Sequence, residues 1–380
     1  MTPSRLSEDD CRLEDLVAVL AARTDPADYP YAADVVQEVL SYDAATLLAA
    51  DRTAVQAELV RALTGGPGLV VFRGAYPDPA VVDRVTATFD AIIAAEKASG
   101  AVAGDHFATP GANDRVWNAL EKLAVRDPAA FVDYYSNDVV ALVSDAWLGP
   151  GYQVTSQTNV VRPGGRAQDP HRDYHLGFLS NELAARFPEH VHRLSPVLTL
   201  QGAVAHTDMP VESGPTMYLP HSHKYVPGYL AWRRPEFRGY FLEHYVQLPL
   251  AKGDAAFFNP ALFHGAGSNV SAGIQRMANL LQVSSAFGRA METVDRSRVV
   301  RAVYPALLER ARAGLPVANA VAAAAEGYPF PTNLDRDAPL DGLTPPSQAS
   351  IVLDLLARGA GPDELEKELA GHDHNHRTGD

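Results

Sequence analysis

The feature that most constrains the fold is a change in the pattern of apolar residues at the turn-forming tripeptide of residues 149–151. From Tyr152 to Ser285 the chain consists of short apolar and β-branched runs separated by Pro, Gly, Asn and Asp, such as YQVTSQTNVV, VLTLQGAVAHT and RMANLLQVSSAF. Several short strands at close spacing are typical of a sandwich or a jelly roll. We therefore predict a mainly β core.

Apolar residues recur at helical spacing on both sides of this core. We expect an N-terminal helical extension at residues 1–65, a jelly-roll domain at residues 66–290 and a C-terminal helical extension at residues 291–380. Within the last part, the Pro-rich stretch 327–346 is a candidate lid or dimer surface, and the polar tail from residue 371 is predicted to be disordered.

Charge and cysteine content narrow the class of protein. The formal net charge of −14 argues against a nucleic-acid partner, which basic patches would favour. The single cysteine, Cys11, excludes an intrachain disulfide and a zinc site built from cysteines. No apolar stretch is long enough for a signal core or a membrane span, so we expect a soluble, cytoplasmic protein. A homodimer and a monomer both remain open.

A metal site is indicated by His171 and Asp173, which follow a turn-rich segment. In an extended strand, residues i and i+2 point to the same face, so the imidazole and the carboxylate would lie side by side. A His-x-Asp triplet alone is weak evidence, because most such triplets are structural or lie at the surface. His264, at the end of KGDAAFFNPALFH, supplies a third ligand. Two histidines and one carboxylate that leave coordination positions open are typical of non-haem iron sites.

Arg276 lies twelve residues after His264. If the strand after Gly273 runs antiparallel to the one that ends at His264, Arg276 lies deeper in the same barrel. A guanidinium binds a carboxylate with two parallel hydrogen bonds, so this residue would suit an anionic co-substrate bound beside the metal. Taken alone, Arg276 could equally form a surface salt bridge.

Several motifs in this order resemble the phytanoyl-CoA dioxygenase family over roughly residues 66–290. They are the His171/Asp173 pair, VESGPTMYLPHSHKY (211–225), KGDAAFFNPALFHGAGSN (252–269) and Arg276. The resemblance implies a double-stranded β-helix (a cupin-like jelly roll) that uses Fe(II), 2-oxoglutarate and dioxygen. It implies a dioxygenase that oxidises, and most simply hydroxylates, a small organic substrate. Specialised or natural-product metabolism is the setting we prefer.

The resemblance also suggests residues that hold 2-oxoglutarate. Arg276 and Thr216 would bind the distal carboxylate, and Gln157, Asn159 or Gln168 would bind the carboxylate next to the metal. The alternative for each amide is that it satisfies buried backbone groups. Pro220-His221-Ser222-His223 departs from the family pattern, because His221 stands where the family usually has Gly, which predicts a strained turn. By analogy His223 orders that turn and is not a metal ligand.

Asp173 also bears on the type of reaction. Related halogenases lack this carboxylate, so its presence favours hydroxylation, desaturation or ring closure over halogenation. Two other functions remain open: a cupin-like metalloenzyme that does not use 2-oxoglutarate, and a non-catalytic jelly-roll binding protein.

Overall fold

The core of the protein is built from two β-sheets. The computed structural model describes residues 5–100, 113–340 and 342–379. Within these residues, an eight-stranded sheet has the order β1-β2-β3-β9-β6-β11-β5-β4, and a three-stranded sheet has the order β10-β7-β8. The strands are β1 Asp34–Val36, β2 Val39–Asp43, β3 Leu69–Arg73, β4 Asn113–Val116, β5 Gln153–Val161, β6 Thr199–Ala205, β7 Thr216–Leu219, β8 Val246–Gln247, β9 Ala255–Phe258, β10 Phe263–Ala266 and β11 Arg276–Ser284.

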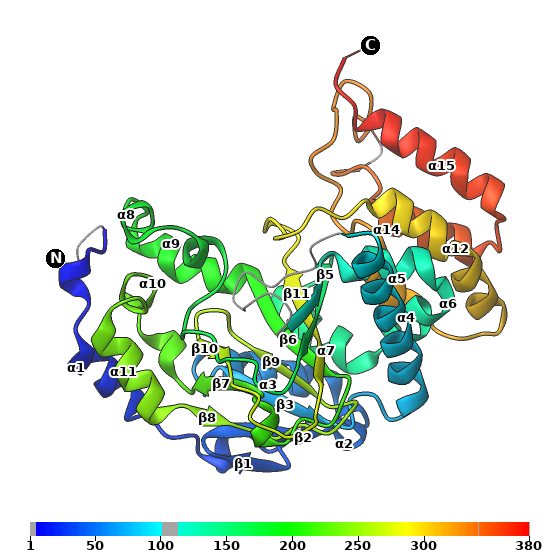
Figure 1. The fold of residues 1–380 in the computed structure, drawn as a ribbon. Coiled ribbons are helices and arrows are strands. Elements are labelled where there is room, and N and C mark those ends of the chain that lie inside the picture. Colours follow the sequence, from blue (N-terminus) through cyan, green and yellow to red (C-terminus); the bar gives the residue numbers. More distant parts are fainter. Residues whose placement is uncertain (1–4, 101–112, 341, 380) are drawn as a thin grey trace.

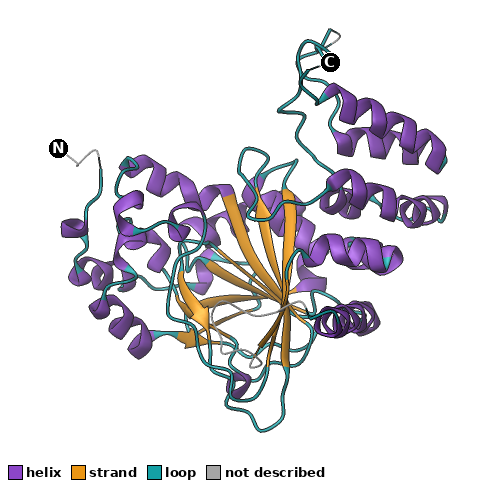
Figure 2. Cartoon of the chain, turned by 45° about the horizontal axis from the view of Figure 1, so that its top comes forward, coloured by secondary structure: helices purple, strands orange, loops and turns teal. Residues whose placement is uncertain are grey.

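Strand pairing is antiparallel apart from the β2–β3 pair, among the paired strands of the described chain. The long strands β5 and β11 pair along their whole length, from Arg276 opposite Val161 to Ser284 opposite Gln153. Alternate residues of these strands face a cavity between the two sheets, and the others face helices. Figure 2 shows the strands as a fan with helices on either side. The mainly β, jelly-roll fold predicted from the sequence is confirmed.

Helices cover the face of the large sheet that points away from the cavity. Helices α4–α7 and α12–α13 contribute to one apolar core with this face, and α1, α10 and α11 pack near the small sheet (Figure 1). The helices are α1 Leu13–Leu20, α2 Ala44–Leu48, α3 Arg52–Thr64, α4 Pro79–Ala98, α5 Ala119–Arg126, α6 Pro128–Tyr135, α7 Asp138–Leu148, α8 Asn181–Ala184, α9 Glu189–Leu194, α10 Gly228–Ala231, α11 Pro235–His244, α12 Arg296–Arg312, α13 Ala318–Ala324, α14 Gln348–Ala357 and α15 Pro362–Asn375.

Side-chain caps fix where several helices begin. The carboxylate of Asp51 accepts a hydrogen bond from the Ala54 N–H at the start of α3, and Asp78 does the same for Ala80 at the start of α4. Pro79 occupies the first turn of α4, where no partner for an N–H is needed. These short-range contacts fix the first turns of α3 and α4.

The structure corrects the expected N-terminal helical extension at residues 1–65. This segment contains β1 and β2, and β2 pairs in parallel with β3, so that Leu40 lies opposite Val70. Residues 39–42 are buried, and their hydrogen bonds are made with the large sheet. A boundary at residue 65 therefore cuts through that sheet. Five residues were too few to stand out from the helical pattern around them.

Two further expectations are corrected. The sequence pattern predicts a helix over residues 115–148, but residues 115 and 116 belong to strand β4, whose polar residues gave no apolar alternation. The tail predicted to be disordered from residue 371 is helical up to Asn375, at the end of α15. No helix of the described part is long and apolar enough to cross a membrane.

Candidate metal centre and ligand cavity

Three potential metal ligands converge at one end of the cavity. His171 lies in the segment after β5, Asp173 follows it, and His264 lies on β10. One ligand atom from each lies within 4.8 Å of the others. Backbone hydrogen bonds in both directions join His171 to His264, with N···O distances of 2.8 and 3.1 Å, and fix the two histidines side by side. The structure thus brings together the three residues predicted to bind metal.

Both imidazoles are oriented by their own backbone. Nδ1 of His171 lies 2.8 Å from the Asp169 carbonyl oxygen, and Nδ1 of His264 lies 2.9 Å from the Leu262 carbonyl oxygen. Because a carbonyl only accepts, each Nδ1 carries the proton and each Nε2 keeps its lone pair. The Nε2 atoms lie 3.6 and 3.4 Å from the Asp173 carboxylate. Such backing of the ring is the arrangement seen behind metal-binding histidines.

The protonation states of His171 and Asp173 favour the binding of a metal cation. Burial lowers the pKa of His171, which keeps the imidazole neutral. Burial alone would raise the pKa of Asp173, but the two imidazoles and the Gln201 amide hold it below its ordinary value. His171 is therefore available as a neutral nitrogen and Asp173 as a carboxylate, the forms in which these side chains bind a metal. This donor set fits iron(II) with coordination positions left open.

Arg276, the first residue of β11, is a buried cation in the same cavity. It is 5% exposed, and its guanidinium forms no hydrogen bond or ion pair with any residue that the structure describes. Burial lowers its pKa to about 10, and the neighbouring Tyr218 phenol opposes that shift. Burying a cation without a counter-ion is costly, so the site is poised for an anion that comes from outside the chain.

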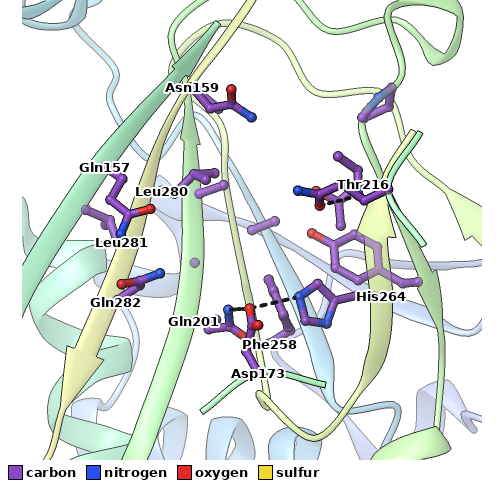
Figure 3. Close-up of a pocket in the computed structure, with 18 of the residues that line it drawn as sticks. Gln157, Asn159, Asp173, Gln201, Thr216, Phe258, His264, Leu280, Leu281 and Gln282 are labelled. Carbon is purple, nitrogen blue, oxygen red and sulfur yellow. Dashed lines mark hydrogen bonds and ion pairs between the residues drawn. The ribbon is translucent and has the colours of Figure 1, made fainter. Parts of the chain in front are cut away.

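The cavity holding these groups has a volume of about 290 Å³. It is lined by strands of both sheets, and Figure 3 shows Asp173, Gln201 and His264 close together below Thr216 and Asn159. The four other residues predicted to bind the co-substrate all line it: Gln157, Asn159, Gln168 and Thr216. Gln168 is partly used by the fold, because its Oε1 accepts a hydrogen bond from the Ala266 N–H at 3.1 Å.

Two cavity residues were missed from the sequence. Gln201 on β6 donates a hydrogen bond to Asp173 Oδ2 over 2.5 Å. Tyr218 on β7 lies opposite His264 in the strand register and near Arg276. Neither belongs to a motif, and only the alternation of cavity-facing residues along predicted strands could have pointed to them.

Arg172, between the two ligands of the His-x-Asp pair, was also missed. It is 2% exposed and donates hydrogen bonds to the carbonyl oxygens of Ser222 and Tyr225, at 2.6 and 2.8 Å. Its guanidinium lies over the rings of Tyr229 and Phe263, 5.3 and 4.8 Å from their centroids. Arg172 thereby ties the ligand-bearing segment to the turn after β7.

That turn has the backbone that the sequence predicted. His221 has a φ of 68°, in the left-handed region that favours glycine. Its Nε2 lies 3.2 Å from the Thr24 hydroxyl, and His223 Nε2 lies 2.9 Å from the Thr64 carbonyl oxygen. Among the described residues, neither histidine belongs to the group of potential metal ligands.

Replacing Gln201 with leucine is expected to lower iron(II) affinity by about 10- to 100-fold, because the Asp173 carboxylate loses the amide that orients it. Competition with a coloured chelator would measure this loss. Gln275→Leu, an exposed position just before β11, is the matched control. Unchanged affinity in Gln201→Leu would show that Asp173 needs no such support.

Comparison with known proteins gives one family. A model of the phytanoyl-CoA dioxygenase (PhyH) family matches residues 66–278. No curated protein matches the sequence. Among solved structures, AviO1 from Streptomyces viridochromogenes Tue57 is 18% identical, with 63% of this chain and 97% of that chain covered and a TM-score of 0.44. HygX from Streptomyces hygroscopicus, solved with nickel and 2-oxoglutarate, is 15% identical, with coverage of 60% and 87% and a TM-score of 0.39.

Proposed function

Because the chain belongs to the phytanoyl-CoA dioxygenase family, whose members use iron(II) and 2-oxoglutarate, we propose that it is an oxygenase that hydroxylates a small organic substrate. The observation that carries this proposal is the presence of Arg276, a buried cation without a counter-ion among the described residues, in the same cavity as the three potential metal ligands. A metal site alone would need no such cation. A dicarboxylate can bind the metal with one end and the Arg276 guanidinium with the other.

In this proposal His171, Asp173 and His264 hold the iron(II). When bound, it supplies the redox chemistry that couples dioxygen to the decarboxylation of 2-oxoglutarate and to the oxidation of a C–H bond. In the balanced reaction, 2-oxoglutarate, dioxygen and R–H give succinate, carbon dioxide and R–OH.

The residues of the chain contribute positioning. Arg276 binds the distal carboxylate of 2-oxoglutarate, and the hydroxyls of Thr216 and Tyr218, which line the cavity on β7, face the same end. Asn159 lies next to this end, since it is paired with Ala278, two residues from Arg276. Apolar cavity residues such as Leu248, Leu250 and Phe258 limit the access of water, which strengthens these charged contacts.

Hydroxylation is favoured over halogenation because Asp173 is present and its carboxylate is held in the charged form. The test is turnover of 2-oxoglutarate under ¹⁸O₂ in chloride buffer. We expect iron-dependent formation of succinate that carries one ¹⁸O atom, and a substrate product that carries ¹⁸O and no chlorine. An epimerised, ring-closed or chlorinated product would contradict hydroxylation, and absence of succinate would contradict the use of 2-oxoglutarate.

A further inference from the structure

One wall of the cavity carries amide groups that the protein leaves without partners. Gln157 on β5 and Gln282 on β11 are 1% and 8% exposed, and both line the cavity. Nε2 of Gln157 and Oε1 of Gln282 are buried without a hydrogen-bond partner among the described residues. Buried polar atoms normally have a partner, so such atoms facing a cavity indicate a bound ligand or ordered water.

The two glutamines lie away from Arg276 and Thr216, which we assign to the distal carboxylate of the co-substrate. In Figure 3 they stand on the wall across the cavity from Thr216 and His264. Gln282 lies six residues along β11 from Arg276, near the opposite end of the strand. Gln157 is paired with Leu280 and not with the Arg276 end of β11. Gln157, predicted to bind the carboxylate next to the metal, therefore lies away from the Arg276 end of the cavity.

An apolar surface lies beside the two amides, which are diagonal neighbours on adjacent strands. Leu280 lies opposite Gln157 in the register and two residues before Gln282 on the same face of β11, and Ala203 of β6 lies on its other side. A ligand that satisfies both glutamines and also covers Leu280 must therefore present polar groups at its edge and carbon–hydrogen surface next to them. A plain aliphatic chain would fill the space and leave both amides unpaired.

Two charged side chains, those of Arg115 and Glu292, lie near this wall, and Oε2 of Glu292 is buried without a hydrogen-bond partner among the described residues. The guanidinium of Arg115 lies over the Trp117 ring, 4.8 Å from its centroid. One oxygen of Glu292 accepts a hydrogen bond from the Asn118 N–H at 2.8 Å. Burial raises the pKa of Glu292, while the Asn118 N–H and the amide of Gln157, which lies near Glu292 but does not meet the geometry of a hydrogen bond, lower it in part. The two glutamines of this wall are uncharged, so they pair well with uncharged polar groups of a substrate.

We propose that this wall binds an uncharged, hydroxyl-rich ring of the sugar or cyclitol class as the substrate, or as the reacting part of a larger one. Hydroxyl groups both donate and accept, so they can pair with either atom of each amide. The carbon–hydrogen face of the ring packs on Leu280, and the hydroxyls at its edge reach Gln157 and Gln282. That this ring is the substrate rests on the proposed function. The binding of such a ring to the wall does not depend on it.

The experiment is ligand-detected NMR with four probes: methyl α-glucoside, glucosamine, gluconate and cyclohexanol. The protein is loaded with zinc(II) and 2-oxoglutarate, and a second sample holds neither. We expect methyl α-glucoside to bind better than the other three probes. Gln157→Leu and Gln282→Leu should each weaken it by about 3- to 10-fold, as expected for one lost hydrogen bond between neutral groups. Gln275→Leu, at an exposed position, should leave it unchanged.

Binding of 2-oxoglutarate is measured in the same variants, which separates the two proposals. We expect Gln157→Leu to keep its affinity for 2-oxoglutarate. A large loss there would return Gln157 to the co-substrate and overturn the inference. Preferred binding of glucosamine, gluconate or cyclohexanol, or no binding of any probe because the amides hold only water, would also overturn it. If wild-type protein binds the glucoside but not 2-oxoglutarate, the proposed function fails and the sugar-like site stands.

Discussion

Replacement of Arg276 with alanine is expected to weaken 2-oxoglutarate binding by about 30- to 5,000-fold and to leave iron(II) binding intact. Truncation of one partner of a desolvated charge pair costs about 2–5 kcal/mol, which corresponds to that range. The guanidinium is buried and has no anionic partner among the described residues, so the co-substrate would make its main charged contact with it. A titration with 2-oxoglutarate, with iron content determined in parallel, measures the effect.

Two further variants sharpen this prediction. Arg276→Lys should restore only part of the affinity, because an ammonium group cannot form the planar pair of hydrogen bonds. Arg358→Ala removes an exposed arginine that pairs with Asp354 and Glu364, and should change nothing. If Arg276→Ala binds 2-oxoglutarate as well as wild type while iron is still bound, then Arg276 does not hold the co-substrate.

The second large effect is expected at the metal ligands. His171→Ala, Asp173→Ala and His264→Ala should each lower iron(II) affinity by more than about 100-fold. This loss exceeds the one expected for Gln201, which only hydrogen-bonds a ligand. The fold should survive, because these side chains line a cavity and do not fill the apolar core. Metal analysis after desalting measures the loss, and circular dichroism checks the fold.

A matched control is His190→Ala, at an exposed position of α9, which should keep its iron. Stoichiometric iron in all three ligand variants, with native circular dichroism, would contradict the assignment of the metal site. Loss of native structure in a variant would instead show that the cluster supports the fold, and Asp173→Asn would then provide the smaller change.

The residues brought together by local geometry could be predicted from the sequence. His171 and Asp173 share a face because they are two residues apart in an extended segment, and Arg276 falls in the cavity because β11 begins there. The strands from β5 to β11 were visible because turn residues interrupt short apolar runs. In each case the signal lies within a few neighbouring residues.

What could not be predicted depends on contacts between distant segments. Gln201 contacts Asp173 across 28 residues, and Arg172 reaches the carbonyl oxygens of Ser222 and Tyr225 across about 50. Glutamine and arginine occur at many exposed positions, so residue type alone did not identify Gln201 and Arg172 as part of the site. Strand β2 was missed for a similar reason, since its stability comes from pairing with β3.

The central claim, that this cavity binds iron(II) and 2-oxoglutarate together, is tested most directly by anaerobic titration of the wild-type protein. Iron(II) and then 2-oxoglutarate are added without oxygen, and the visible absorption spectrum is followed. We predict a weak metal-to-ligand charge-transfer band that saturates at one equivalent of each and is absent in Asp173→Ala. Bound iron without this band would indicate a cupin-like metalloenzyme that does not use 2-oxoglutarate. Absence of bound iron would indicate a binding protein, and either result would contradict the claim.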